Sequence, residues 1–275
     1  MTLTKIGTDF LYMYGVILTE ELQYSEVPSI KGIDQKPIYT KIYKDLAVVL
    51  TPVNAPDFSQ QQLDLLVKNA EWLKEKAFHH HEVIEAVHKQ VTVLPMSFCT
   101  IFQKEETLES LLSEQYDVFY QKLLSLKGKQ EWNVKMFCNK EKALAYVIDH
   151  SPAVMELKEK LTMMPKGKQF IMKKKLENLI ASQFEVEQMK WWQEINQELM
   201  PFVHDINLRK NWGKEVTERK DEMIINCDYL LETNNVDHFL NKIQDIEKTY
   251  TPFGCTFHIT GPWPAYHFSK MVKET

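Results

Sequence analysis

Hydrophobic and polar positions follow two periods along the chain, and the change of period marks where elements begin and end. Near the beginning, apolar residues either alternate with polar ones or form short continuous runs, and both patterns predict strands. From Ser59, apolar residues recur every three or four positions, which predicts helices. Strands followed by helices without regular alternation indicate an α+β domain. The predicted elements are strands 10–18, 36–43 and 46–53, helices 59–77, 80–89 and 108–126, and a strand 91–102 broken at Pro95.

Residues 127–129, Lys-Gly-Lys, form the clearest boundary, so we predict an N-terminal α+β domain over 1–128 and a second domain over 129–275. The second domain's pattern has the order β-α-β-β-α-β, the ferredoxin-like arrangement, with extended helices inserted at about 151–203. Its predicted elements are strands 131–138, 205–212, 222–231 and 254–260, a helix from residue 140, a long helix 168–199 and a helix 236–250.

The long predicted helix 168–199 exceeds what one compact domain covers, because at 1.5 Å per residue it measures on the order of 45–50 Å. Part of it should therefore project, and Pro201 should end it. Trp191 and Trp192 point about 100° apart on a helix and cannot both fill one narrow apolar stripe. We therefore include both as candidate partner-binding residues.

Composition sets limits on function. The 275 residues suffice for two domains, and the net charge of −5 gives no basic surface for nucleic acid. No signal peptide and no apolar run of about 20 residues is visible, so we expect a cytoplasmic protein without a membrane partner. The four cysteines lie far apart without a CxxC motif, and we expect buried, reduced thiols.

Candidate chemistry is sparse, and no cofactor is predicted, since no phosphate-binding glycine motif is present. His81, Glu85 and His88 would share one helix face, and the His79–His88 region suggests a metal-dependent hydrolase as an alternative function. A solvated polar face is the plainer interpretation, because the sequence HEVIE is not HExxH. A small-ligand sensor on the ferredoxin-like half is a further alternative.

The segment 260–268, TGPWPAYHF, places aromatic side chains on a stiff chain fixed by two prolines. These aromatics either seal the protein's own core or contact a partner. We expect Trp263, which follows the last predicted strand, to pack on the second domain's helices. Tyr266 and Phe268, farther along, are predicted to form an exposed partner contact.

Six blocks of the sequence together resemble the gas vesicle protein F/L family, over nearly the whole chain. The blocks are FLYMYGVI (10–17), HHHEVIEAV (79–87), VLPMSFCTIF (93–102), GKQEWNVKMF (128–137), GKQFIMKKK (167–175) and GPWPAYHF (261–268). The chain departs from the family pattern at Ser97 and Cys99, where arginine and glycine are common, and at Ala265, where a second proline is common.

The resemblance implies a non-enzymatic accessory or minor structural protein of gas vesicle assembly. It implies an α+β N-terminal domain and a modified ferredoxin-like C-terminal domain with a long helical insertion. The implied partners are the hydrophobic gas vesicle shell protein and other accessory proteins. Shell subunits with large apolar faces aggregate when uncovered, so a helper with a complementary groove or sheet edge would hold them until assembly. The implied location is cytoplasmic and gas vesicle associated.

Overall fold

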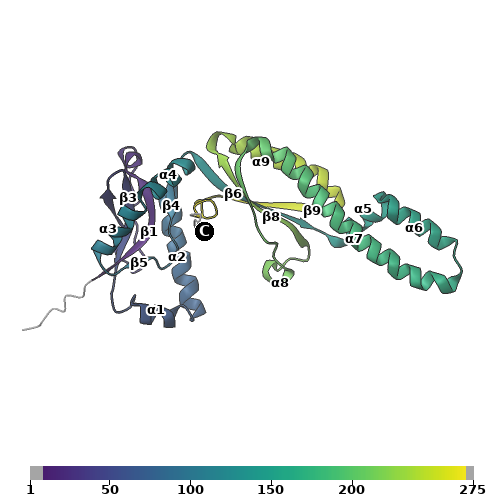
Figure 1. Ribbon diagram of the computed structural model, residues 1–275, viewed down its shortest axis with the longest axis horizontal. Coiled ribbons are helices and arrows are strands. Elements are labelled where there is room, and N and C mark those ends of the chain that lie inside the picture. Colours follow the sequence, from purple (N-terminus) through teal and green to yellow (C-terminus); the bar gives the residue numbers. More distant parts are fainter. Residues whose placement is uncertain (1–8, 271–275) are drawn as a thin grey trace, which may run out of the picture. The chain divides into compact units, whose positions relative to one another are not determined.

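The structure, a computed structural model, describes residues 9–270, and these divide into two compact units. Unit 1 holds the described residues up to Glu131 together with those from Pro262 onward, and unit 2 holds Trp132–Gly261. The chain passes from one unit to the other inside two strands, β6 (Lys129–Cys138) and β9 (Cys255–Trp263). Both units combine helices with a sheet (Figure 1), which confirms the predicted α+β class.

Unit 1 is built on an antiparallel sheet with the strand order β2-β3-β1-β4, in which β5 also pairs with β1. The strands are β1 (Phe10–Leu18), β2 (Tyr39–Tyr43), β3 (Leu46–Val53), β4 (Val93–Pro95) and β5 (Ile101–Phe102). The predicted bounds of β1 and β3 are confirmed, and the predicted break at Pro95 separates β4 from β5. β2 and β4 begin later than their patterns suggested, at Tyr39 and at Val93.

A β-bulge in β1 decides which of its side chains enter the core. The register with β3 shifts between Met13 and Gly15, and this shift breaks the strict alternation of side chains along the strand. Tyr12, Tyr14 and Ile17 therefore reach the same core cluster. A Cβ at position 15 would lie 2.6 Å from a side-chain methyl of β4 and 2.8 Å from a β4 carbonyl oxygen. Glycine is therefore required where β4 passes this close to the bulge.

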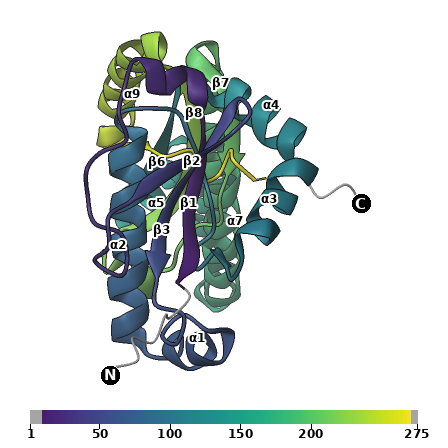
Figure 2. The ribbon, with the colours of Figure 1, turned by 90° about the vertical axis from the view of Figure 1, so that its left-hand side faces the viewer.

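Helices cover both faces of this sheet, with α2 on one face and α3 and α4 on the other (Figure 2). The helices of unit 1 are α1 (Gln60–Leu66), α2 (Ala70–His88), α3 (Glu105–Glu114) and α4 (Tyr116–Leu126), with a 3₁₀ turn η1 (Thr19–Gln23) after β1. The predicted division into helices 59–77 and 80–89 is wrong. Asn69 caps α2 by accepting the backbone N–H groups of Glu71 and Trp72, so the break falls there and α2 continues through the histidines.

Unit 2 contains a four-stranded sheet with the order β7-β8-β6-β9. Its remaining strands are β7 (Val203–Leu208) and β8 (Glu222–Glu232), and α9 (Val236–Tyr250) lies between β8 and β9 in sequence. The first strand thus lies between the third and the last, as the ferredoxin-like pattern requires, which confirms that prediction. Short helical segments connect the elements: η2 (Met200–Phe202), α8 (Lys214–Thr217), η3 (Thr233–Asn235) and η4 (Thr251–Phe253).

The first crossover of unit 2 holds the long insertion, α5 (Lys140–His150), α6 (Pro152–Thr162) and α7 (Lys166–Leu199). At 34 residues, α7 is about 51 Å long. Its C-terminal half is buried through Phe184, Trp191, Ile195 and Leu199, whereas Phe170 in its N-terminal half is 82% exposed. Figure 1 shows α6 and this half of α7 extending beyond the sheet of unit 2, so the prediction that part of the helix projects is confirmed.

The predicted assignment of the C-terminal residues to the second domain differs from the structure. The described residues from Pro262 onward belong to unit 1, whose core Tyr266 joins. Ala265 and Phe268 are buried there as well. The sequence pattern could not show this, because a short proline-containing segment has no period that tells which surface it covers.

The four cysteines are free thiols, as expected, and three of them are buried. Burial raises the pKa of Cys99 to about 11 and that of Cys227 to about 12. A hydrogen bond with Cys138, together with burial, raises the pKa of Cys255. Since the thiolate is the nucleophile, we expect iodoacetamide at pH 8 to modify these thiols at least about 100-fold more slowly in the folded protein than in guanidinium. Mass spectrometry over time measures this; rapid labelling of Cys227 in folded protein would contradict the buried geometry.

Candidate functional site

The segment from Pro262 to Lys270 packs on unit 1 and closes its core. Of the two interpretations of this segment, a seal of the protein's own core or a partner contact, the packing favours the seal. Two local turns shape it: the Tyr266 N–H donates to the Pro264 carbonyl at 2.6 Å, and the Ser269 N–H donates to the Ala265 carbonyl at 2.8 Å. These turns direct Phe268 inward, where only 7% of its surface is exposed.

His81 of α2 is the main contact of this segment. Its Nδ1 lies 2.7 Å from the Tyr266 hydroxyl, and its ring lies 5.7 Å from the Tyr266 ring and 5.6 Å from the Trp263 ring. Burial raises the pKa of Tyr266, so its hydroxyl stays protonated. The histidine thus contacts two aromatic rings of the segment.

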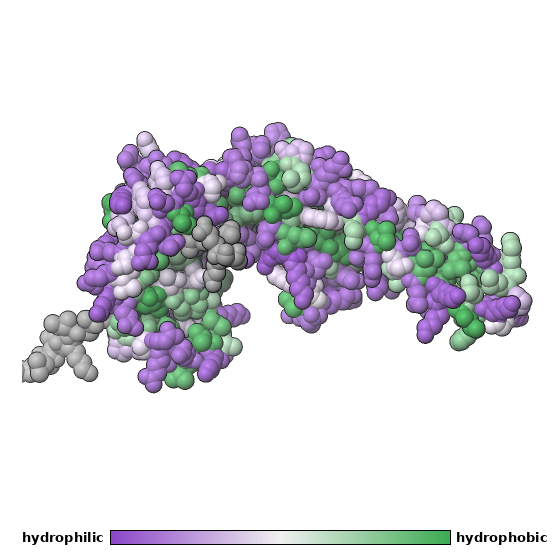
Figure 3. Space-filling model, in the orientation of Figure 1, coloured by the Kyte–Doolittle hydropathy of each residue, from purple (hydrophilic) through white to green (hydrophobic). Residues whose placement is uncertain are grey.

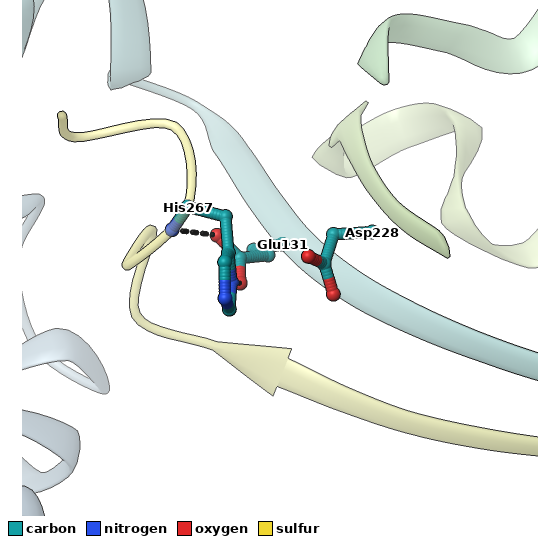
Figure 4. A group of neighbouring side chains, drawn as sticks. All are labelled: Glu131, Asp228 and His267. Carbon is teal, nitrogen blue, oxygen red and sulfur yellow. Dashed lines mark hydrogen bonds and ion pairs between the residues drawn. The ribbon is translucent and has the colours of Figure 1, made fainter. Parts of the chain in front are cut away.

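A buried carboxylate provides the second contact. Glu131, 2% exposed, accepts the backbone N–H of His267 at 2.9 Å, and its other oxygen lies 2.7 Å from Nδ1 of the His267 ring (Figure 4). Both residues belong to unit 1. A charge-assisted bond to a backbone N–H fixes the path of the segment as well as its side chain.

His80, the residue before His81 on α2, forms a separate buried network that joins β1 to the loop after β4. Its Nδ1 lies 2.9 Å from the Tyr12 hydroxyl and its Nε2 lies 3.2 Å from the Met96 carbonyl. The Tyr12 hydroxyl also accepts the backbone N–H of Cys99, a residue with φ of 64°. Cys99 thus adopts the left-handed conformation that glycine favours.

The candidate metal ligands of α2 do not assemble. In the part of the chain that the structure describes, His81, Glu85 and His88 are not among the groups whose donor atoms lie within 4.8 Å of one another. Glu85 pairs with Lys89 at 2.7 Å, and its other oxygen lies 4.0 Å from Nε2 of His81, whose Nδ1 contacts the Tyr266 hydroxyl. The face that the helical spacing predicts therefore holds structural contacts.

The five residues that the sequence proposed for partner binding have different surroundings. Phe268 is buried, so its predicted exposure is wrong, and Tyr266 is mostly enclosed by the core of unit 1. Trp191 is also buried, in the core of unit 2. Trp192 and Trp263 keep partly exposed surfaces, and for them partner contact stays a prediction. Trp263, which we expected on the helices of unit 2, contacts His81 of unit 1.

Sequence reasoning did not identify the roles of His81 and Glu131. Glu131 gave no clear signal, because it alternates with the polar residues Asn133 and Lys135 along its strand, as a residue on a solvated face would. His81 gave none, since its spacing with Glu85 and His88 matched a ligand pattern equally well.

Together, these features define an α+β protein whose second half is a ferredoxin-like sheet with a long helical insertion and whose C-terminal segment completes the first unit. The family described as "Gas vesicle synthesis protein GvpL/GvpF" matches residues 10–270, and the chain belongs to this family. Membership supports a role in gas vesicle assembly and confirms the resemblance that the sequence blocks indicated.

Similarity to individual known proteins extends over most of the chain and agrees with this family assignment. The chain is 24% identical to gas vesicle protein F1 of Halobacterium salinarum, covering 95% of this chain and 93% of that protein. It is 22% identical to gas vesicle protein L of a Streptomyces species, covering 88% and 87%. Among solved structures, GvpF from an Anabaena species matches with a TM-score of 0.69 and 17% identity, over 96% of this chain and 97% of that chain. GvpF from Microcystis aeruginosa matches with a TM-score of 0.65 and 16% identity, over 95% and 99%.

Among the helices between residues 9 and 270, none combines the length and the apolar character that a bilayer span requires.

The buried position of His80 predicts a pH-dependent stability. Burial lowers the pKa of His80 from 6.5 to about 4 in the folded protein. The unfolded chain therefore binds this proton first, so its contribution is complete above pH 6.5 and is lost as the pH falls toward 4. Between pH 7 and pH 5 we expect the free energy of unfolding to fall by on the order of 2 kcal/mol from this group. Urea unfolding at both pH values measures it, and His80→Gln should remove this part of the difference; an unchanged difference would contradict the assignment.

The docked C-terminal segment predicts that Phe268 contributes more to stability than the Tyr266 hydroxyl. Phe268→Ala should lower the free energy of unfolding by about 3–5 kcal/mol, as for other buried aromatics. Tyr266→Phe removes only the hydrogen bond to His81 and should cost about 1 kcal/mol. Guanidinium unfolding of both variants measures the two values. Losses below about 0.5 kcal/mol in both variants would show that the segment does not close the core of unit 1.

Proposed function

We propose that this chain is a non-enzymatic accessory protein that binds the hydrophobic gas vesicle shell protein and other accessory proteins during gas vesicle assembly. One observation carries the proposal: unit 1 exposes large apolar side chains on α1, in the turn that follows it and on α2. Four of these residues, which we call the corner patch, are Leu65, Val67, Leu73 and Phe78. Figure 3 shows hydrophobic side chains gathered over these helices.

The corner patch is not needed for the core of unit 1. Leu65 is 59% exposed and Phe78 is 61% exposed, while the core-facing side of the same helices is filled by Leu63, Val83 and Ile84. The chain therefore exposes large apolar side chains on helices whose buried faces are already complete. Gathered apolar side chains at a surface are typical of protein interaction sites.

The remaining chemistry supports a binding role over the hydrolase alternative. Both ring nitrogens of His80 lie within hydrogen-bonding distance of protein atoms, and His81 is engaged by Tyr266. Both nitrogens of His80 and Nδ1 of His81 thus hold elements of unit 1 together. A soluble protein with an apolar surface patch can cover an apolar subunit before it joins a shell.

Substitution of the corner patch tests this proposal. Leu65→Ser combined with Phe78→Ser removes two large apolar contacts that are exposed in the free protein. We expect retention of the shell protein in a pull-down to fall at least about 10-fold, since two lost apolar contacts of this size are worth more than 1.4 kcal/mol. The melting temperature should stay close to that of the wild type, because neither side chain belongs to the core.

The matched control is Leu208→Ser with Val216→Ser, two residues of unit 2 that are 64% and 59% exposed. This control removes similar apolar surface elsewhere and should retain the shell protein normally. Equal retention by both double variants would reject the corner patch as the contact, and no retention by the wild-type protein would reject the proposed partner.

A further inference from the structure

One exposed face of α7 carries separated charges. Six exposed residues lie on it within a sector of about 100°, at spacings of three or four, and we call them the α7 face: Lys166, Phe170, Lys174, Glu177, Ala181 and Glu185. Its N-terminal half is basic around Phe170, and its C-terminal half is acidic around Ala181. Met172 and Leu179 lie on another face of α7 and are less exposed.

The four charges of the α7 face are unsatisfied within the chain. In residues 9–270, no ion pair or hydrogen bond involves the side chains of Lys166, Lys174, Glu177 or Glu185, although Lys160 and Lys190 nearby do form pairs with glutamates. Phe170, between two of these lysines, is 82% exposed. A large apolar ring flanked by unpaired cations has the composition of a contact site.

The acidic half of the α7 face borders a groove. A cavity of about 420 Å³ lies between α5 and α7, and apolar residues line it: Leu144, Ile148, Ile180 and Phe184. Glu177, Ala181 and Glu185 also line this cavity. The small Ala181 side chain leaves room beside it, so the groove offers an apolar floor with carboxylates at its rim.

We propose that the α7 face binds a second copy of this chain through an antiparallel, two-fold symmetric contact. A two-fold axis between Lys175 and Leu176 pairs every position of the basic half with one of the acidic half. Lys174 then meets Glu177 of the second copy, Phe170 meets Ala181 at the groove, and Lys166 meets Glu185. Symmetry makes each of these contacts twice.

Charge complementarity selects this arrangement. A parallel alignment would place lysines against lysines and glutamates against glutamates, which is unfavourable, whereas the antiparallel register opposes unlike charges at all four charged positions. The chain as a whole carries −5, so two copies repel each other without a specific pairing of this kind. Because exposed ion pairs are weak and screened by salt, the dimer should be weak and should dissociate at high ionic strength.

Analytical ultracentrifugation of the full-length protein tests the proposal at low and at high salt. The wild type should show a monomer–dimer equilibrium at about 20 mM salt that shifts to monomer at about 500 mM, where the screening length is only a few ångströms. Lys174→Glu and Glu177→Lys should each raise the dissociation constant at least about 10-fold, since one substitution changes two contacts. Phe170→Ala should weaken the dimer comparably, by emptying the groove.

The decisive variant exchanges the charges. Lys174→Glu combined with Glu177→Lys restores both pairs in a symmetric dimer, so its dissociation constant should return to within about 3-fold of the wild type, a difference below 1 kcal/mol. Lys173→Glu is the matched control, because it makes the same charge change beside the α7 face without facing a glutamate in this register. It should leave the equilibrium nearly unchanged.

Three results would overturn the proposal. The wild-type protein could stay monomeric at low salt up to about 0.5 mM, a concentration at which even weak contacts are measurable. The single charge reversals could leave the dissociation constant unchanged, or the double charge exchange could fail to restore association. Circular dichroism of every variant confirms that α7 is intact. None of these substitutions touches the corner patch, so shell-protein binding can succeed or fail independently.

Discussion

The structure depends on the return of the C-terminal segment to unit 1. The contact between His81 and Tyr266 joins residues 185 positions apart, and that between Glu131 and His267 spans 136 positions. The core of unit 1 is incomplete until the last part of the chain arrives, although its sheet and helices form from the first 131 residues. Contacts of such high sequence separation form late, because the entropy of closing the loop is lost before any contact compensates for it.

Five of the six sequence blocks that resemble the family supply residues to these contacts. FLYMYGVI supplies Tyr12, HHHEVIEAV supplies His80 and His81, and VLPMSFCTIF supplies the carbonyl of Met96. GKQEWNVKMF supplies Glu131, and GPWPAYHF supplies its partner His267, whose neighbour Tyr266 contacts His81. Residues that look unrelated along the chain thus meet around one stretch of α2, and each is constrained by what it holds.

The sequence predicts the elements of this fold well because their periods are local. The bounds of β1, β3 and α9 follow directly from alternation or helical spacing, and the ferredoxin-like order follows from the succession of elements. The sequence predicts long-range docking poorly. TGPWPAYHF has suitable residues for a seal or a contact, and only the position of His81 and Glu131 in space decides between them. Asn69 shows the same limit at short range, since a capping residue inside a helical pattern is recognised only when its side chain is seen to accept N–H groups.

The remaining block, GKQFIMKKK, behaves differently. It begins α7, and its Phe170 and Ile171 are exposed. Packing restricts the buried residues of the other blocks, but packing cannot restrict a side chain that faces solvent. The contact between two copies that we propose for the α7 face would place Phe170 and Lys174 against a partner surface, and it would constrain this block as core closure constrains the residues of unit 1.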